Sequence, residues 1–294
     1  MKNKTLLIIS FLTFNLIVSQ DLKLPTIFSN NMIMQQESVV SIWGWSKPNS
    51  KVSINVSWNK KKYKTKSNNS GEWLLKISTP KAGEAHKISI GTNTDLIHIT
   101  NVLMGEIWIA SGQSNMQMNL NGYKNEPIVG ANDAIANSKN SRIRFFTVER
   151  NTSKIPLDNL IGKWSVSNQE NSPFFSAVAY SFANYLNKTL DVPIGIIHTS
   201  WGGTPAEAWT DSTSLSANFE KSEIKNHGGR PSDEPSSLYN AMISPLTNYC
   251  IKGAIWYQGE SNVSRASSYA KLKNSMIEGW RREWNQGSFP FYFV

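Results

Sequence analysis

Three short segments of the sequence combine residue types that can carry out acyl transfer. Their sequences are Ser-Gly-Gln-Ser-Asn-Met at residues 111–116, Thr-Ser-Trp-Gly-Gly-Thr at 199–204 and Gln-Gly-Glu-Ser-Asn at 258–262. Each segment follows a short apolar stretch of the kind that forms a buried strand. Because ligands of open α/β sheets bind outside the carboxyl ends of the strands, we expect the three segments to converge on one cleft.

Ser114 in the first segment is a candidate nucleophile. It follows a glycine turn and is predicted to open a helix, whose positive N-terminal end would stabilise a developing negative charge. A serine in this position can also act only as a helix N-cap. Because Met116 stands where a second glycine would be expected, the segment differs from the Gly-x-Ser-x-Gly elbow of α/β-hydrolases.

The other two segments contain groups that could form an oxyanion hole. Gly202 and Gly203 allow close approach of the backbone and leave N–H groups free to donate, although a glycine pair also forms ordinary tight turns. The side-chain amides of Gln258 and Asn262 could donate to the same oxyanion, with Glu260 holding them in place. The alternative for this third segment is a capped loop.

The elements that must position these segments fall into two groups. Alternating apolar and polar residues with intervening turns predict a small β-sandwich at residues 24–103, with strands at 39–43, 52–58, 73–77, 87–90 and 96–99. From about residue 103, strands alternate with helices, which predicts an α/β domain with a mostly parallel sheet. Its predicted strands are 107–110, 142–148, 194–198, 254–257 and 289–294, and its predicted helices are 176–187 and 267–284. The last strand is a continuous apolar run of the kind found inside parallel sheets, so we expect this domain to be incomplete at its C-terminal end.

The first residues have the pattern of a secretory signal peptide. Lys2 and Lys4 precede an apolar stretch at residues 6–18, which Ser19 and several polar residues follow. The stretch is shorter than the roughly 20 residues that a membrane-spanning helix needs. We therefore expect cleavage of residues 1–19, a secreted or periplasmic mature chain, and no stable membrane insertion after cleavage.

Composition narrows the possible partners. The formal net charge is +9, but the densest basic run, residues 60–66, is predicted to be the solvated tip of a hairpin, which argues against nucleic-acid binding. Cys250 is the only cysteine, so no internal disulfide can form, and no pair of His residues has the spacing of metal ligands. The 11 Trp residues can stack on sugar rings or fill the core.

Together, the three segments and their order resemble one known family. The chain is similar to the sialate O-acetylesterases and related carbohydrate acetylesterases of the SGNH-hydrolase superfamily. The resemblance covers essentially all of residues 24–294 and is strongest at residues 105–116, 201–209 and 256–262, with further matching residues at 24–32 and 43–45. It implies an SGNH-hydrolase-like, flavodoxin-like parallel sheet at residues 103–294, preceded by an N-terminal β-sandwich at residues 20–102.

The resemblance also implies roles for individual residues. Ser114 would be the nucleophile. The oxyanion hole would be completed by one glycine, Gly202 or Gly203, and by one side-chain amide, that of Gln258 or Asn262. We favour Gln258 because the family's usual Gly-x-Asn-Asp order is altered here. Gln113, Asn115 and Glu260 would support the site. The implied reaction is hydrolysis of an O-acetyl ester on carbohydrate, through an acyl-enzyme and without a metal or organic cofactor. The motifs suit esters of sialic acid, xylan and xyloglucan alike.

The histidines do not follow the family pattern. The family's general base is a histidine in an Asp-x-x-His block near the C-terminus, and none of His86, His98, His198 and His227 lies in such a block. His86 and His98 belong to the predicted sandwich, His198 is predicted to pack in the core, and His227 is a loop residue. We therefore expect this chain to have little activity. A non-catalytic carbohydrate-binding module and a lipase-like enzyme for longer acyl chains remain as alternatives.

Overall fold

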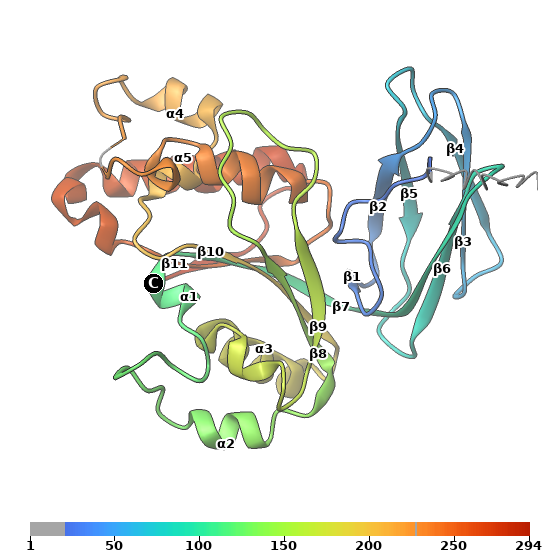
Figure 1. Ribbon diagram of the computed structural model, residues 1–294, viewed down its shortest axis with the longest axis horizontal. Coiled ribbons are helices and arrows are strands. Elements are labelled where there is room, and N and C mark those ends of the chain that lie inside the picture. The colour runs from blue at the N-terminus through green and yellow to red at the C-terminus, as the bar shows by residue number, and fades with distance from the viewer. Residues whose placement is uncertain (1–20, 227) are drawn as a thin grey trace, which may run out of the picture.

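The computed structural model describes residues 21–226 and 228–294. The expected signal peptide at residues 1–19 lies outside the described residues, as does His227. A β-sandwich and a larger α/β part lie side by side and are joined by one long strand, β7 (Figure 1). No helix among the described residues is both long and apolar enough to cross a membrane.

The sandwich packs two antiparallel sheets face to face. One sheet pairs β2 (Val39–Trp45) with β5 (Glu72–Ser78). The other pairs β3 (Lys51–Val56) with β4 (Lys62–Lys66) and β6 (His86–Gly91), and β6 in turn with the first part of β7 (Leu96–Gly112). Alternate residues of these strands are buried, as a half-buried sheet requires. The expected strands are therefore confirmed here.

The basic run at residues 60–66 is not simply the tip of a hairpin, as the sequence suggested. Most of it forms strand β4, which pairs with β3 along its whole length. Tyr63 is buried between the exposed Lys62 and Lys64, so the run has the alternation of a strand at the edge of the sandwich. The lysines still face solvent.

Strand β7 connects the two parts without a break. Its first residues alternate between exposed and buried and pair with β6, whereas residues 102–112 are all buried. This buried half pairs in parallel with β1 (Ile33–Gln35), β10 (Ile194–Ser200) and β11 (Gly253–Tyr257). The expected division between residues 102 and 103 falls where the burial pattern of this strand changes, and as a domain boundary it stays a prediction.

The α/β part has the expected mostly parallel sheet. Its strand order is β9-β8-β10-β7-β11-β12, in which only β9 (Gly162–Ser167) is antiparallel to its neighbour β8 (Asn140–Val148), and β12 (Phe291–Phe293) lies at the other edge. One face carries α1 (Ser114–Gln117), α2 (Ala131–Ala136) and α3 (Ala177–Leu190), and the other carries α4 (Ser212–Asn218) and α5 (Ala266–Trp284) (Figure 1).

A row of buried Trp residues fixes α5 to the sheet. Trp256 on β11 lies edge to face with both Trp209 and Trp280, at 6.1 Å between ring centroids in each case. The indole N–H of Trp280 donates to the carbonyl of Trp209 at 3.0 Å. This row supports the short 3₁₀ helix Ala206–Trp209, and it therefore also supports the turn at residues 202–204 just before it.

Candidate active site

Ser114 lies where β7 turns into α1. Gly112 permits this turn, because its φ of +139° is rarely open to other residues and a Cβ there would lie 2.1 Å from the carbonyl oxygen of Tyr257. The side chain of Ser114 is exposed, and its hydroxyl has no hydrogen-bond partner among residues 21–226 and 228–294. The backbone N–H of Ser114 likewise has no acceptor there, as expected for the first residue of a helix.

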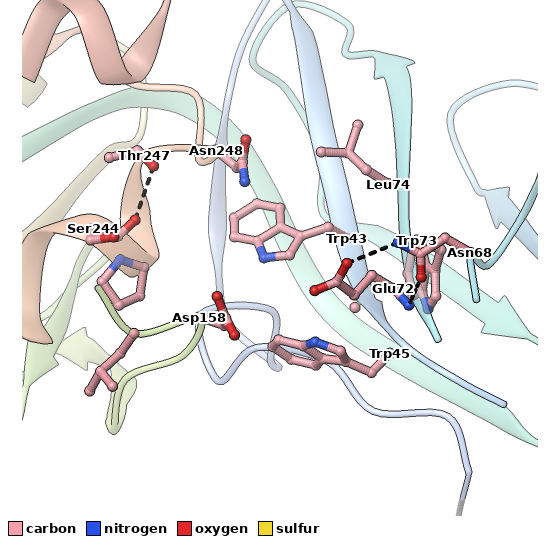
Figure 2. A pocket seen from close by; sticks show the side chains of 13 residues that line it. Trp43, Trp45, Asn68, Glu72, Trp73, Leu74, Asp158, Ser244, Thr247 and Asn248 are labelled. Carbon is pink, nitrogen blue, oxygen red and sulfur yellow. Dashed lines mark hydrogen bonds between the residues drawn. The ribbon is translucent and has the colours of Figure 1, made fainter. Parts of the chain in front are cut away.

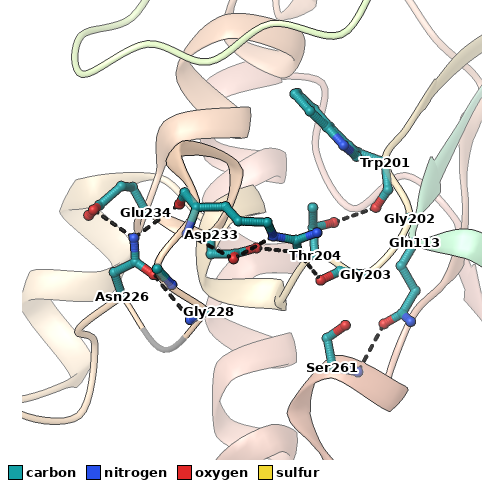
Figure 3. A network of polar contacts seen from close by, with 12 residues as sticks. Gln113, Trp201, Gly202, Gly203, Thr204, Asn226, Gly228, Asp233, Glu234 and Ser261 are labelled. Atoms are coloured by element: carbon teal, nitrogen blue, oxygen red, sulfur yellow. Dashed lines mark hydrogen bonds and ion pairs between the residues drawn. The ribbon is translucent and has the colours of Figure 1, made fainter.

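Gln113 attaches the third segment to the first. Its side chain is buried, and its Oε1 accepts the N–H groups of Ser261 at 3.1 Å and of Gly259 at 3.4 Å (Figure 3). Its backbone N–H donates to the carbonyl of Tyr257 at 3.0 Å. The predicted supporting residue thus holds the carboxyl ends of β7 and β11 together.

The glycine turn of the second segment lies directly beside Ser114. A Cβ added at Gly202 would be 3.5 Å from the Cβ of Ser114, so only a glycine leaves this space open. The N–H of Gly202 donates to Oε1 of Gln117 at 2.7 Å, whereas the N–H of Gly203 has no acceptor in the described part of the chain. Gly203 also has a φ of +72°, which favours glycine.

Arg230 holds this turn from the outside. Its guanidinium donates to both carboxylate oxygens of Asp233, at 2.8 and 2.7 Å, and to the carbonyl oxygen of Gly203 at 2.5 Å (Figure 3). Asp233 is buried, and its hydrogen bond to Arg230 raises the pKa of the guanidinium. Local sequence patterns contain no signal for this contact, because 27 residues separate Arg230 from Gly203.

Gln258 is placed differently from the expected oxyanion donor. Its Nε2 donates to the carbonyl of Thr204 at 3.2 Å and to Oδ1 of Asn262 at 2.7 Å, which uses both of its amide protons. Its Oε1 accepts the hydroxyl of Tyr269 at 2.9 Å. In this arrangement Gln258 positions its neighbours and has no proton left for a substrate.

Asn262 lies in a buried polar network and keeps one amide proton free. Its Oδ1 also accepts the N–H of Ala206 at 3.0 Å, and its Nδ2 donates to Oε2 of Glu207 at 2.8 Å. Glu207 is in turn paired with Arg265, whose Nε lies 3.1 Å from Oε1. The second N–H of Asn262 has no acceptor among the residues described. Sequence reasoning assigned no role to Glu207 or Arg265, although a carboxylate inside the apolar stretch 205–209 was a usable signal.

Glu260 does not hold the amides of Gln258 and Asn262, as the sequence suggested. It is exposed, and its Oε1 accepts a hydrogen bond from Nδ2 of Asn115 at 2.5 Å. This contact joins α1 to the 3₁₀ helix Glu260–Arg265. Asn115 and Glu260 therefore tie the first and third segments together at the surface, while Gln113 does so underneath.

None of the described histidines is placed as a base for Ser114. His198 is buried, as predicted, and its Nε2 lies 2.7 Å from Oγ of Ser200, while burial lowers its pKa to about 4. His86 and His98 lie in the sandwich strands β6 and β7, against Ser57 and Ser89. In the described ranges no cluster of His, Cys, Asp and Glu could hold a metal ion.

A mostly parallel α/β sheet with a serine at the carboxyl end of a central strand, beside a glycine turn, places the chain in the SGNH-like class of α/β folds. A family model described as "Carbohydrate esterase, sialic acid-specific acetylesterase" matches residues 104–294. The chain belongs to this family.

Individual relatives agree with this assignment. The chain is 32% identical to the sialate O-acetylesterase of Homo sapiens over 297 residues and 30% identical to that of Mus musculus over 318 residues. These matches cover 90% of this chain but 55% and 58% of those proteins, so the chain spans about half the length of the curated relatives it matches. A crystal structure of a carbohydrate acetylesterase from Xanthomonas citri superposes with a TM-score of 0.84 at 31% identity, over 93% of this chain and 60% of that one.

Proposed function

We propose that the chain acts as a serine esterase that removes O-acetyl groups from carbohydrate, with Ser114 as the nucleophile. One observation carries this proposal most strongly. The exposed Ser114 hydroxyl lies at the end of a central strand, beside the glycine turn at residues 202–203, and neither this hydroxyl nor the N–H of Gly203 has a partner in the part of the chain that the structure describes. Family membership supports the reaction class and an acetylated carbohydrate as the substrate.

The proposed reaction has two steps. Oγ of Ser114 attacks the acetyl carbonyl carbon while its proton passes to a base, and the carbonyl oxygen becomes an oxyanion. Collapse of this intermediate breaks the ester bond, and the sugar hydroxyl leaves with a proton. Water then attacks the acetyl-serine in the same way, which releases acetate and restores Ser114.

The donors to the oxyanion are proposed from the N–H groups that remain free. They are the backbone N–H groups of Ser114 and Gly203 and the second amide N–H of Asn262. The N–H of Gly202 joins them if the side chain of Gln117 turns away. In this scheme Gln258 orients Asn262, and Glu207 with Arg265 fixes the Asn262 amide from behind.

We further propose that the base for Ser114 is not among the described histidines and that this chain alone turns over slowly. His198 is poorly suited, because burial lowers its pKa to about 4, which makes it a weak base, and because its Nε2 already faces Ser200. A serine hydrolase without its base keeps roughly a 10³–10⁴-fold acceleration over water, which comes from the oxyanion hole and binding.

The test supplies a base from solution. The chain would be assayed for hydrolysis of p-nitrophenyl acetate with increasing 2-methylimidazole, in parallel with Ser114→Ala and with Ser275→Ala, a control in a half-buried serine of α5 whose hydroxyl donates within the helix to the carbonyl of Lys271. We expect the base to accelerate the parent and Ser275→Ala, and to leave only the solution background in Ser114→Ala. Equal rates in Ser114→Ala and the parent would refute the nucleophile.

The same assay separates the remaining alternatives. A rate that increases from acetyl to octanoyl esters would favour a lipase-like enzyme over an acetylesterase. Sugar binding without release of acetate from acetylated xylan, acetylated xyloglucan or O-acetylated sialic acid, with base present, would favour a non-catalytic module. Rapid Ser114-dependent hydrolysis without added base would contradict the proposal that the chain lacks an effective base.

Export from the cytoplasm is also proposed, on the sequence of residues 1–19 alone. It is tested by expressing the full chain in a Gram-negative host and determining the N-terminus of the protein in the periplasm or medium. We expect a mature N-terminus near residue 20. A chain that stays in the cytoplasm with residues 1–19 intact would contradict export.

A further inference from the structure

Three of the 11 Trp residues are only partly buried, and the side chains of two of them make contacts that explain their positions. Trp201 lies next to Gly202 and carries the guanidinium of Arg150 over its ring. Trp58 donates its indole N–H to the carbonyl of Ser78 at 3.0 Å and packs against His86. The indole of Trp45 has neither a hydrogen-bond acceptor nor a ring contact in the described part of the chain.

Trp45 lines a cavity between the sandwich and the α/β part. The cavity has a volume of about 470 Å³, which is in the range of small-molecule sites. Figure 2 shows Trp43, Trp45 and Glu72 on the sandwich side, with Asp158 and Asn248 opposite them on the α/β side. Its walls therefore come from strands β2 and β5 and from loops far away in the sequence.

The register of the sandwich explains why these aromatic side chains lie here. Trp43 is opposite Leu74 and Trp45 is opposite Glu72 in the β2–β5 pair, so all four share the outer face of this sheet. The intervening residues of both strands face the sandwich core. Trp43 is buried by edge-to-face contact with Phe28, at 4.6 Å between ring centroids, and forms a wall. Trp45 keeps an accessible ring.

The polar groups of the cavity are largely free. Asp158 has no hydrogen bond or ion pair, and the Asn248 amide has no partner, among residues 21–226 and 228–294. Glu72 accepts a bond from Asn68 at 2.9 Å through Oε2 and keeps Oε1 free. No Lys, Arg or His belongs to the described lining. The accessible ring of Trp45 thus has hydrogen-bond acceptors and one free amide around it, and the described lining contains no cationic side chain.

We propose that this cavity is a second carbohydrate site, which binds a neutral pyranose unit of a glycan without reacting with it. The apolar face of the sugar ring stacks on Trp45, and its hydroxyls donate to Glu72 and Asp158 and bond with the amide of Asn248. The two carboxylates repel a sugar acid such as sialic acid.

The position of the cavity adds a reason to bind a polymer. Strands β2 and β5 lie in the sandwich on the right of the view, whereas α1 lies well to the left of them in the α/β part (Figure 1). Residues 104–112 of β7, which run toward Ser114, alone span roughly 25 Å at about 3.3 Å per residue. A single sugar cannot occupy both places, but a glycan held at Trp45 raises the local concentration of its other units near Ser114.

The test uses sugars that carry no acetyl group, so that it does not depend on hydrolysis. The Ser114→Ala chain would be titrated calorimetrically with xylohexaose, cellohexaose and mannohexaose as neutral probes, and with sialyllactose and choline as anionic and cationic probes. We expect binding of at least one neutral hexasaccharide, weakened at least tenfold by Trp45→Ala and by Asp158→Ala. The matched control Trp58→Ala should bind like the parent, and circular dichroism should show all variants folded.

Several outcomes would overturn the second site. They are no binding of any neutral hexasaccharide by the folded chain, equal binding by Trp45→Ala and the parent, or binding of sialyllactose or choline only. Trp45→Ala should also leave base-assisted hydrolysis of p-nitrophenyl acetate unchanged. This readout keeps the second site distinct from the proposed esterase, since loss of Ser114 abolishes hydrolysis and leaves hexasaccharide binding intact.

Discussion

Replacing Gly202 with alanine tests the placement of the reacting carbonyl most sharply. The added Cβ would lie 3.5 Å from Cβ and 3.6 Å from Cα of Ser114, and 3.1 Å from Oε1 of Gln117. Gly202 is not among the residues with positive φ, so alanine can adopt its backbone conformation. The only tight contact is with the end of a flexible side chain, which can move.

The expected effects on stability and on reaction are therefore very different. We expect the free energy of unfolding to change by less than about 1 kcal/mol, because alanine causes no backbone strain here and only the half-buried side chain of Gln117, which accepts the N–H of Gly202, has to adjust. The methyl group fills the space beside Ser114 where an ester carbonyl must lie, and it separates that carbonyl from the N–H groups of the turn. We expect the Ser114-dependent rate to fall at least roughly 10²-fold, the usual effect of losing one oxyanion donor.

Gly203→Ala is the matched control for this substitution. Its φ of +72° makes alanine cost about 1 kcal/mol, and its Cβ would face Arg230 at 3.4 Å rather than Ser114. Urea unfolding would give the stabilities, and p-nitrophenyl acetate hydrolysis with 2-methylimidazole would give the rates. A folded Gly202→Ala chain that reacts like the parent would refute this placement of the carbonyl.

Three further predictions follow from the same contacts. Gly112→Ala should lower the free energy of unfolding by about 3 kcal/mol or more, because its Cβ would lie 2.1 Å from a backbone carbonyl oxygen. Urea unfolding measures this change, and a midpoint like that of the parent would contradict the tight turn at Gly112. His198 has a folded pKa of about 4, below the usual 6.5, so the unfolded chain binds its proton first. Stability should thus fall by about 1.4 kcal/mol per pH unit from 6.5 toward 4, relative to His198→Gln; the same pH profile for both chains would rule this out. Glu207→Gln should slow Ser114-dependent hydrolysis about tenfold or more without unfolding the chain, because its single acceptor oxygen cannot hold both Asn262 and Arg265, and an unchanged rate would exclude that positioning role.

Much of the fold and the order of the site segments could be predicted from local sequence. Apolar stretches followed by small polar turns marked the ends of β7, β10 and β11, because a buried parallel strand has to be apolar and its ligand-binding turn cannot be. The helices α3 and α5 were also predicted close to their observed bounds.

The hydrogen-bond partners inside the site could not be predicted in this way. The N–H of Gly202 is used by Gln117, which is 85 residues away, and the amide of Gln258 is used by Thr204 and Asn262. These contacts depend on how three turns meet in space, and local patterns contain no information about that. The outward direction of Trp45 likewise depends on the register between β2 and β5, which is set by the whole sandwich.

The measurement that tests the central claim most directly is identification of the acetylated residue. The chain would be mixed with p-nitrophenyl acetate and 2-methylimidazole, quenched in acid, digested and mapped by mass spectrometry, next to Ser114→Ala. We predict an acetyl group on Ser114 that accumulates in the parent and is absent from the variant. Acetylation of another serine in the parent, or the same acetylated peptides in both chains, would contradict Ser114 as the nucleophile.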